Sequence, residues 1–591
     1  MRKIFTSLML LASAVTAMAT DYQGTLTVVI NGFVAQPTTN QITLNDQTDG
    51  KYELTLKNFV LMQDDEPMPI GNIVLQNINA VDEEGAKVLE TKQDITLQEG
   101  NLEGVDMWMG PMLGEVPVDL RAVVSGDGSI LTADIKIPLV GQDVQVKFDS
   151  RTFQLPNSGF EEFHTATAGK ATSDEPNNWH SFMSCTGNFA SFVKGNIHTF
   201  ISKEIRPGST GTNSVLVKSV NATLAVANGT LTTGQLKAGG MTAASKSNNA
   251  FIDFGNTAKD ANGDPFYTVL NTLPDSISVW VKFKQATPVS AHPYATMTAV
   301  ITDGSYYQEP QDKDYTDIIV GEARNATIAE TDGEWKKITV PFTYNNNGKS
   351  PKGILVTFST NADPGQGSVG DELYLDDVEL IYSSYLSDLS VNGTTIQGFA
   401  SDKYDYEYNV EKGATVDELI SKVAYTVAGN EAHGIVSVTE NVMTITVLSA
   451  DLLSSHTYTI TFTGASDDDN KGNGDDDNKG NGDDDNKGNG DDDNKGNGDD
   501  DNKGNGDDDN KGNGDDDNKG NGDDDNKGNG DDDNNGNGDD DDKTGVNSVI
   551  SADSQGKTIY NINGQPVNSV KNGEVYIIKY SNGKTLKSIN K

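Results

Sequence analysis

The chain has little cysteine, little positive charge and no long apolar stretch, and each scarcity excludes a class of protein. Its 591 residues include one cysteine, Cys185, so disulfides within the chain are excluded. Lys and Arg number 44 against 88 Asp and Glu, for a formal net charge of -44. Nucleic acids and anionic lipid surfaces reward clustered basic side chains, so neither is an expected partner. No stretch of about 18 apolar residues follows the N-terminus, so no transmembrane segment is expected.

The residue types that most often carry catalysis are scarce or scattered. The 6 histidines form no metalloprotease motif, no paired zinc spacing and no catalytic triad. Cys185 lies between strand-like phenylalanines, which favours a buried small residue over a nucleophile. With 88 acids in the chain, opposed carboxylate pairs are unavoidable, so no glycosidase pair can be nominated. Catalysis stays open, and a non-enzymatic role is favoured.

The N-terminus has the pattern of a secretory signal peptide. Arg2 and Lys3 precede an apolar run from Ile4 to Val15, and Ala17-Met18-Ala19 has the small-x-small pattern of a signal peptidase site. The run is too short to span a bilayer, which needs about 20 residues. We therefore expect residues 1–19 to be a signal peptide and the protein to be exported.

Residues 20–150 alternate apolar and polar side chains, as in Tyr52, Leu54 and Leu56, which is typical of half-buried strands. Strand-like runs recur with turn residues between them, and this favours a barrel or sandwich. The blocks DYQGTLTVVINGF at 21, YELTLKNFVL at 52 and WMGPMLGEVPVDLRAVV at 108 resemble the calycin-like β-barrel domain of exported Bacteroidetes proteins. The resemblance implies a lipocalin-like barrel.

Lipocalin-type barrels can enclose a small apolar ligand, so binding of such a ligand is one alternative function. Trp108, Met109, Met112 and Leu113 could line the mouth of the barrel. The other interpretation, which is more common in small barrels, is that these side chains fill the interior as core.

Residues 151–383 form a second β unit. Ile277, Val279, Val281 and Phe283 alternate with polar residues, and the length without a clear helix predicts a two-sheet jelly roll. The segments PNSGFEEF at 156, SISVWVKF at 276 and ELYLDDVELIY at 372 resemble the "putative carbohydrate metabolism domain", a family similar in build to jelly-roll carbohydrate-binding modules. The resemblance implies work on glycans.

Residues 384–464 predict a small β-sandwich with one short helix, because Val416, Leu419, Ile420 and Val423 have helical spacing. YLSDLSVNGTTIQGFASDKYDYEYNV and HTYTITFTG resemble the cadherin-like β-sandwich domain of bacterial surface proteins. The resemblance implies a spacer.

Residues 465–545 are dominated by the repeat DDDNKGNG, present eight times from Asp467 to Gly530. Nothing in the repeat is apolar, so we expect a disordered, acidic linker. A calcium β-roll and an EF-hand are the alternatives, but the first needs apolar residues and the second a bidentate Glu, and neither is present.

Residues 546–591 return to strand-like sequence, at 558–562 and 575–580, with Asn-Gly turns at 563 and 582. IYNINGQPV and GEVYIIKYSNGKTLKSI resemble the C-terminal sorting domain of the type IX secretion route. The resemblance implies contact with that secretion machinery. The alternative is a terminal β module without a sorting role.

Sugar binding would use aromatic side chains, since pyranose rings stack on Trp and Tyr. Trp280 falls on the polar face of its strand, between Ser278 and Lys282. Tyr306, Tyr307 and Tyr315 lie in a polar, loop-like stretch. These four are the candidate ligand-binding residues, and ordinary packing is the alternative for each.

A structural calcium ion is the candidate cofactor. Asp376 shares a strand face with Val378 and Leu380, so its carboxylate should point toward packed surface and need donors or a cation. The resemblance to jelly-roll modules implies that Glu161 or Glu162 could meet Asp376 or Asp377 as calcium ligands. Hydrogen bonds between the terminal strands are the alternative.

The sequence thus predicts an all-β exported protein at the outer membrane surface or outside the cell. The leading hypothesis is non-catalytic glycan binding by the jelly roll. The alternatives are glycoside hydrolysis in the same domain and an apolar ligand in the barrel. The sequence leaves open which glycan binds, the oligomeric state and whether the tail is cleaved.

Overall fold

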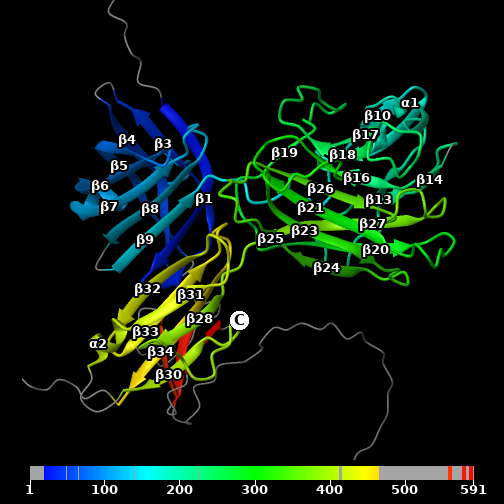
Figure 1. Cartoon of the computed structure of the whole chain (residues 1–591). Coiled ribbons are helices and arrows are strands. Elements are labelled where there is room, and N and C mark those ends of the chain that lie inside the picture. The colour runs from blue at the N-terminus through cyan, green and yellow to red at the C-terminus, as the bar shows by residue number, and fades with distance from the viewer. Residues whose placement is uncertain are drawn as a thin grey trace, which may run out of the picture. The chain divides into compact units, whose positions relative to one another are not determined.

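The computed structural model describes residues 19–464, apart from 48–49, 64–65, 140–141, 224 and 411–414, and also 557–561, 575–580 and 585–589. All of the predicted signal peptide except Ala19, and the acidic repeats, lie outside the described residues. Almost every element in Figure 1 is a strand, which confirms the all-β prediction. The described helical pieces are short: η1 (Gly110–Leu113), η2 (Phe182–Ser184), α1 (Ala190–Val193) and α2 (Val416–Ile420).

The chain divides into two compact units, Met1–Asp469 and Asn470–Lys591. Among the described helices, none has the length and apolarity needed to cross a membrane.

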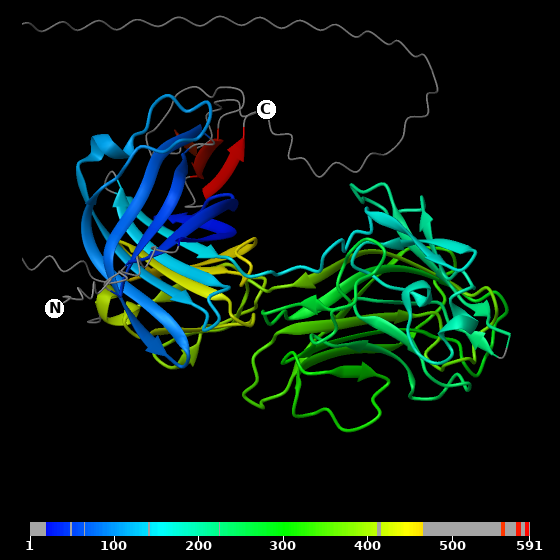
Figure 2. The same cartoon turned by 90° about the horizontal axis from the view of Figure 1, so that it is seen from above.

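The first domain is a closed β-barrel (Figure 2). Its strands are β1 (Ala19–Ile30), β2 (Phe33–Val34), β3 (Thr38–Asp46), β4 (Lys51–Gln63), β5 (Glu66–Glu83), β6 (Ala86–Thr96), β7 (Glu115–Val124), β8 (Leu131–Leu139) and β9 (Gln142–Asp149). From β3 to β9 each strand pairs antiparallel with the next, and β1 pairs with both β3 and β9. The pairing of β1 with β9, from Thr25 opposite Asp149 to Ile30 opposite Val144, closes an eight-stranded barrel. The hairpin strand β2 adds to β1.

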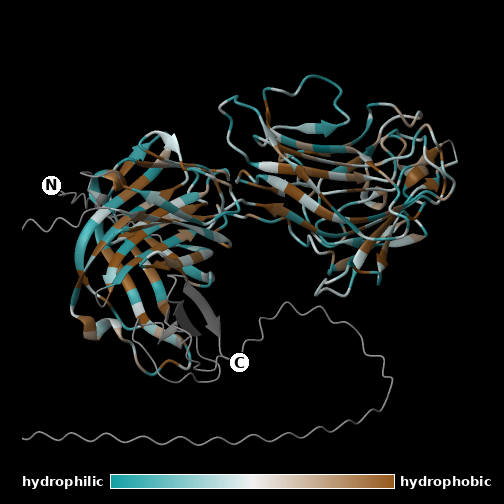
Figure 3. Ribbon diagram, turned by 90° about the horizontal axis from the view of Figure 1, so that it is seen from below, coloured by the Kyte–Doolittle hydropathy of each residue, from teal (hydrophilic) through white to brown (hydrophobic). Residues whose placement is uncertain are grey.

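Side chains fill the barrel interior. Along β7, five alternate residues from Val116 to Val124 are buried, and Figure 3 shows the matching bands of apolar and polar residues on the strands. Phe59 is fully buried in the same cluster. Of the residues predicted at the mouth, Trp108 is buried, Met109 and Leu113 pack on the core, and Met112 is exposed.

The second domain is a sandwich of two antiparallel sheets. The five-stranded sheet has the order β12, β13, β27, β20, β24, and the other sheet has the order β16, β26, β21, β23, β25, with β19 also pairing with β26. The bounds are β12 (Thr199–Ser202), β13 (Ser214–Lys218), β16 (Thr230–Thr232), β19 (Thr268–Val269), β20 (Ser276–Lys284), β21 (Ala295–Thr302), β23 (Ile319–Ile328), β24 (Lys336–Pro341), β25 (Thr343–Tyr344), β26 (Gly353–Ser359) and β27 (Glu372–Ile381).

The core of this sandwich lies between the two sheets. The alternating residues predicted on β20 are fully buried in it: Ile277, Val279, Val281 and Phe283. Trp179 is also fully buried, with its ring 5.2 Å from that of Phe160, and it donates from Nε1 to the carbonyl of Pro156 over 3.1 Å.

A small sheet packs on the outer face of the β21–β26 sheet. Its strands, in the order β17, β18, β22, are β17 (Gln235–Ala238), β18 (Asn248–Ile252) and β22 (Tyr307–Glu309). Leu236 and Ile252 of the small sheet share a buried cluster with Val300 and Leu355 of the larger one. Two hairpins complete the domain, β10 (Phe163–Ala168) with β11 (Ala171–Pro176), and β14 (Val220–Asn221) with β15 (Val226–Ala227).

The third domain has two further sheets. One joins β28 (Leu386–Val391), β29 (Thr394–Thr395) and β31 (Val423–Val427), and the other joins β30 (Asp405–Asn409), β32 (His433–Thr439), β33 (Val442–Leu448) and β34 (Ser455–Thr463). The short helix expected here is α2, whose N-terminus is capped by Thr415 Oγ1 accepting from the Glu418 amide. It ends at Ile420, and Val423 begins a strand instead.

This third domain makes specific contacts with the barrel. Arg151 pairs with Asp149 at 2.8 Å and with Glu431 at 2.6 Å. Thr27, which is fully buried, donates to the carbonyl of Leu452 over 2.8 Å.

The second unit contains a three-stranded antiparallel sheet of β35 (Lys557–Asn561), β36 (Val575–Tyr580) and β37 (Thr585–Ile589). Its first two strands fall where the sequence predicted strands. The predicted Asn-Gly turns lie outside the described residues, and the sorting role stays a prediction.

Gly71 tests the packing of the barrel wall. A Cβ there would lie 2.0 Å from the carbonyl oxygen of Gln98, and φ is +120. Gly71→Ala should therefore lower the free energy of unfolding by roughly 2–4 kcal/mol, measured by calorimetry. The matched control is Gly50→Ala, which also has positive φ but meets nothing within 4 Å, and should cost about 1 kcal/mol. Equal losses in the two variants would contradict the predicted clash.

Candidate functional site

The four predicted ligand-binding aromatic residues do not form one platform. Tyr307 is fully buried and Tyr315 is 4% exposed, with their rings 5.2 Å apart in the cluster beneath the small sheet. Tyr306 is 37% exposed and its ring lies 5.8 Å from Phe251. Of these tyrosines, Tyr306 alone presents an exposed ring.

Trp280 lies on the five-stranded sheet, apart from these tyrosines. The Arg206 guanidinium lies over its ring at 5.5 Å. A β-bulge between Ser278 and Trp280 interrupts the alternation of β20, and Ser278 is fully buried instead of facing solvent. The Trp280 ring is half-buried and engaged by a cation of the same domain.

The carboxylates predicted to bind calcium have protein donors. Asp376 is fully buried, and its Oδ2 accepts from the Arg206 amide over 2.9 Å. Asp377 Oδ2 accepts from Arg206 Nε over 2.5 Å. Asp376 Oδ1 has no hydrogen-bond partner among the described residues.

The two glutamates are also engaged. The Glu161 carboxylate accepts from the amides of Thr212 at 3.0 Å and Asn213 at 3.2 Å. Partial burial opposes ionisation, but these hydrogen bonds lower the pKa of Glu161 below its ordinary value. Glu162 accepts from Asn177 Nδ2 over 3.3 Å. A calcium ion would have to compete with these donors and with the Arg206 charge, so the four residues fit the ion poorly, and calcium here stays a prediction.

Cys185 behaves as a structural residue. It is 1% exposed in the cluster beneath the small sheet, and burial raises the pKa of its thiol to about 12. A thiol with such a pKa is almost entirely protonated at neutral pH and is a poor nucleophile.

The second domain has a pocket of about 440 Å³ on the outer face of the β21–β26 sheet. Strand register builds its floor: Thr296 lies opposite Ser359, and Thr298 lies opposite Thr357 on one side and Arg324 on the other. Since β-strands alternate faces, these polar side chains point away from the core that Met297 and Ala299 help form.

Aromatic and amide side chains form the walls. Phe182 lies in η2, Phe192 lies in α1, and Phe189 is the N-cap residue of α1. The ring centroids of Phe189 and Phe192 are 6.0 Å apart. Phe192 is 50% exposed. The amides are those of Asn228, Asn248 and Asn361. Apolar ring faces beside amides and hydroxyls suit a ligand with both apolar and hydroxyl surfaces.

The buried Tyr307 orients the ion pair of Glu309 and Arg324, which lies at one end of the pocket. Tyr307 Oη donates to Glu309 Oε2 over 2.6 Å and accepts from Arg324 Nη2 over 3.1 Å. Arg324 Nη1 pairs with the same Glu309 oxygen at 2.9 Å. Burial raises the pKa of Tyr307 well above its ordinary value, so it stays a hydrogen-bond donor. Tyr307 thus positions lining residues without lining the pocket itself.

Asn249 has an unsatisfied acceptor on the outer face of the small sheet, because it alternates with Ala250, which faces the buried cluster. Its Nδ2 donates to the carbonyl of Lys246 over 3.0 Å, which leaves Oδ1 buried with no hydrogen-bond partner among the described residues. A buried acceptor of this kind costs free energy until something donates to it.

Among the described residues that line the pocket, Glu309 is the one carboxylate, and it is bound by Arg324 and Tyr307. Glycoside hydrolysis generally needs two carboxyl groups flanking the bond. The pocket has the groups to bind a sugar and lacks that pair.

Sequence reasoning missed most of this site. Thr296, Thr298 and Arg324 are polar residues at alternate positions of buried strands, and this pattern alone indicates an outward face. What makes that face a pocket is the small sheet and α1 above it, whose placement no local pattern shows.

Comparison with known proteins identifies the first domain. The family model of the calycin-like β-barrel domain matches residues 18–150, so this part of the all-β chain is a calycin-like barrel. A search of curated proteins found no match. The resemblances proposed for the later domains and the tail stay predictions.

Several solved structures, three of them from bacteria, show a partial likeness to this chain. A "putative glycoside hydrolase" from Bacteroides thetaiotaomicron is 16% identical, with a TM-score of 0.28, covering 54% of this chain and 86% of that one. A "putative outer membrane protein" from Bacteroides fragilis is 13% identical, with a TM-score of 0.16, covering 58% and 97%. The glycoside hydrolase domain of Endo-D from Streptococcus pneumoniae is 8% identical, with a TM-score of 0.16, covering 44% and 37%. At these scores the likenesses carry no conclusion for this chain.

The pKa of Asp376 allows a pH test of the cluster formed by Asp376, Asp377 and Arg206. Burial, reinforced by Asp377 and opposed by the Arg206 amide, raises the pKa of Asp376 from 3.8 to about 6. The folded state therefore holds an extra proton between these values, and stability from this group falls as pH rises from about 4 to 7. Asp376→Asn cannot ionise, so relative to wild type it should gain roughly 1–3 kcal/mol across that range, measured by urea unfolding.

The same variant also tests the predicted calcium ion. If added Ca²⁺ stabilised the wild type at pH 7 and not Asp376→Asn, the cluster would be a calcium site and the expected gain would be wrong.

Proposed function

We propose that the second domain binds a glycan in the pocket between the β21–β26 sheet and the small sheet, without hydrolysing it. The observation that carries the proposal is the row of floor hydroxyls of Thr296, Thr298 and Thr357, which face a pocket that is also lined by phenylalanines. A sugar hydroxyl would hydrogen-bond to a floor threonine while a ring face packs on Phe189 or Phe192.

The size of the pocket supports a short glycan segment. Its volume of about 440 Å³ lies within the range of small-molecule sites, roughly 300–1,000 Å³. The floor hydroxyls and the wall amides can both donate and accept, as sugar hydroxyls require.

Binding without hydrolysis follows from the lining acids. Glu309 Oε2 pairs with Arg324 and accepts from the Tyr307 hydroxyl, so this oxygen is engaged in fixing the wall. With one such carboxylate among the described lining residues, the acid and base roles of a glycosidase have no second holder.

The calycin-like barrel is the other domain in which a small ligand could bind. Its interior is filled by side chains such as Phe59, and the residues at its predicted mouth pack on the core or face solvent. The structure therefore offers no observation in favour of an apolar ligand there.

We also propose that the protein is exported, on the basis of the signal-like N-terminus and the tail that resembles a sorting domain. The acidic segment would then be a tether for the folded domains. Cell fractionation with an antibody to the second domain would test this, and a signal confined to the cytoplasm would refute it.

The pocket is tested by filling it. The full chain is screened on a glycan array, and the affinity for the best ligand is measured by calorimetry. Thr298→Trp should weaken binding by at least about tenfold, or roughly 1.4 kcal/mol, because the indole would occupy the floor. Thr298→Val should also weaken it, since a floor hydroxyl is lost.

The controls are Trp280→Ala and Tyr306→Ala, whose rings lie outside the described lining residues. Both should bind as the wild type does. Unchanged binding by Thr298→Trp, with loss in Trp280→Ala, would move the site to the other sheet. Release of reducing sugar would show hydrolysis and overturn the non-catalytic proposal.

A further inference from the structure

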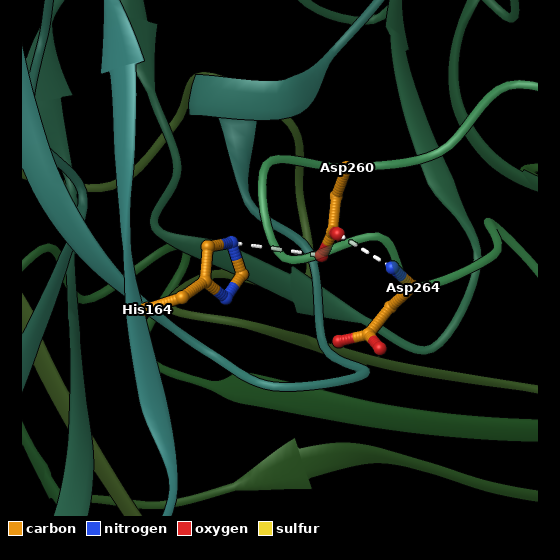
Figure 4. Close-up of side chains that lie close together, drawn as sticks. All are labelled: His164, Asp260 and Asp264. Carbon is orange, nitrogen blue, oxygen red and sulfur yellow. Dashed lines mark hydrogen bonds and ion pairs between the residues drawn. The ribbon is translucent and has the colours of Figure 1, made fainter.

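Two histidines and two carboxylates meet beside the β10–β11 hairpin. His164 lies on β10, Glu175 on β11, His180 just after that hairpin, and Asp260 in the loop between β18 and β19. In Figure 4 the His164 ring points at Asp260, with Asp264 beside them. The side chains of Glu175, His180 and Asp260 have 0% exposure, and that of His164 has 9%.

The facing atoms are close without being hydrogen-bonded. Asp260 Oδ2 lies 3.4 Å from His180 Nε2 and 3.5 Å from His164 Nε2. His164 Nε2 also lies 3.8 Å from Glu175 Oε2. None of these four atoms has a hydrogen-bond partner among the described residues, although buried polar atoms rarely lack one.

Neighbouring groups hold two of these side chains so that one atom of each is left free. His164 Nδ1 lies 3.1 Å from Asn177 Oδ1, an acceptor that places the proton on Nδ1 and the lone pair on Nε2. Glu175 Oε1 accepts from the amide of Ser181 at 2.7 Å and from its hydroxyl at 2.5 Å. Partners that orient a ligand from behind in this way are typical of metal sites.

Asp260 is held in the same manner. Its Oδ1 accepts from the amides of Asn262 at 2.9 Å and Asp264 at 2.8 Å, which leaves Oδ2 facing the two histidines. Ligand atoms of His164, Asp260 and Asp264 all lie within 4.8 Å of one another.

The distances distinguish an ion pair from a metal site. A charge-assisted N–H···O bond between imidazolium and carboxylate spans about 2.7–2.9 Å. Tetrahedral ligands about 2.0–2.2 Å from a zinc ion lie about 3.3–3.5 Å from one another. The separation of 3.5 Å between Asp260 Oδ2 and His164 Nε2 matches the second arrangement.

We propose that His164, Asp260 and Asp264 bind one divalent transition-metal ion of the zinc class, with His180 and Glu175 close beside them. Mixed imidazole and carboxylate donors suit zinc, whereas calcium takes oxygen ligands. This site is separate from the carboxylates near Arg206 and does not depend on glycan binding.

The ion would link the Asp260 loop to the hairpin and thereby support one wall of the pocket. The His180 amide donates to the carbonyl of Thr232 on β16 over 2.8 Å, and Phe182, two residues later, lines the pocket. A bound ion would therefore stabilise the domain and its wall together, in the manner of a structural zinc site.

The test uses Zn²⁺ and the full chain. After treatment with EDTA, incubation with Zn²⁺ and desalting, the wild type should retain about one zinc per chain by mass spectrometry. EDTA should lower the melting temperature by several degrees, and Zn²⁺ should restore it. Failure to retain zinc, together with an unchanged melting temperature, would overturn the proposal.

The variants separate this site from the acidic segment, whose Asp467–Lys543 stretch holds 31 Asp. His164→Ala and Asp260→Asn should reduce zinc affinity at least about tenfold, as expected for lost ligands. The matched control, His292→Ala, alters a partly exposed histidine paired with Asp363 and should retain zinc. Equal retention by all three variants would place the metal elsewhere and refute the site.

Cobalt gives a readout that does not depend on a variant folding. Co²⁺ bound to the wild type should show the intense visible absorption of tetrahedral coordination. A weak octahedral spectrum would instead indicate binding by carboxylates of the acidic segment and would refute the site.

Discussion

The alternation of side chains across one sheet is the constraint on which the second domain depends. On β21, Met297 and Ala299 enter the core while Thr296 and Thr298 face the pocket, because successive residues of a strand point to opposite faces. A one-residue slip would exchange the two sets and lose both core and floor. The register with β26, which sets Thr298 opposite Thr357, therefore builds the binding face and the hydrophobic core by the same hydrogen bonds.

Much of the fold could be predicted, because period-two patterns are local. The buried face of β20 and the barrel strands follow directly from alternation, and the short helix near Val416 was also expected. The site was harder. The YYQEP segment has the composition of a polar loop, yet Tyr307 pairs across to Ile252 as part of a small sheet and is fully buried. Composition alone cannot show a pairing between segments more than fifty residues apart.

Two further differences between the sequence-based expectations and the structure also arise from contacts between segments that are distant in sequence. Trp280 was expected on an open polar face, but a bulge shifts the register beside it and Arg206, from a loop distant in sequence, covers its ring. The histidines lack any short zinc spacing because Asp260 joins His164 and His180 from another part of the domain. Only the tertiary arrangement, in which a loop after β18 returns to the β10–β11 hairpin, brings these donors together.

The barrel is sealed by its first and last strands, with Thr25 opposite Asp149. A chain that emerges from a ribosome or a translocation pore N-terminus first presents β1 long before its second neighbour exists. Until β9 follows, one edge of β1 is an open template for stray pairing. The barrel therefore cannot close until β9 has been synthesised, and until then the unpaired edge of β1 is open to pairing with other chains.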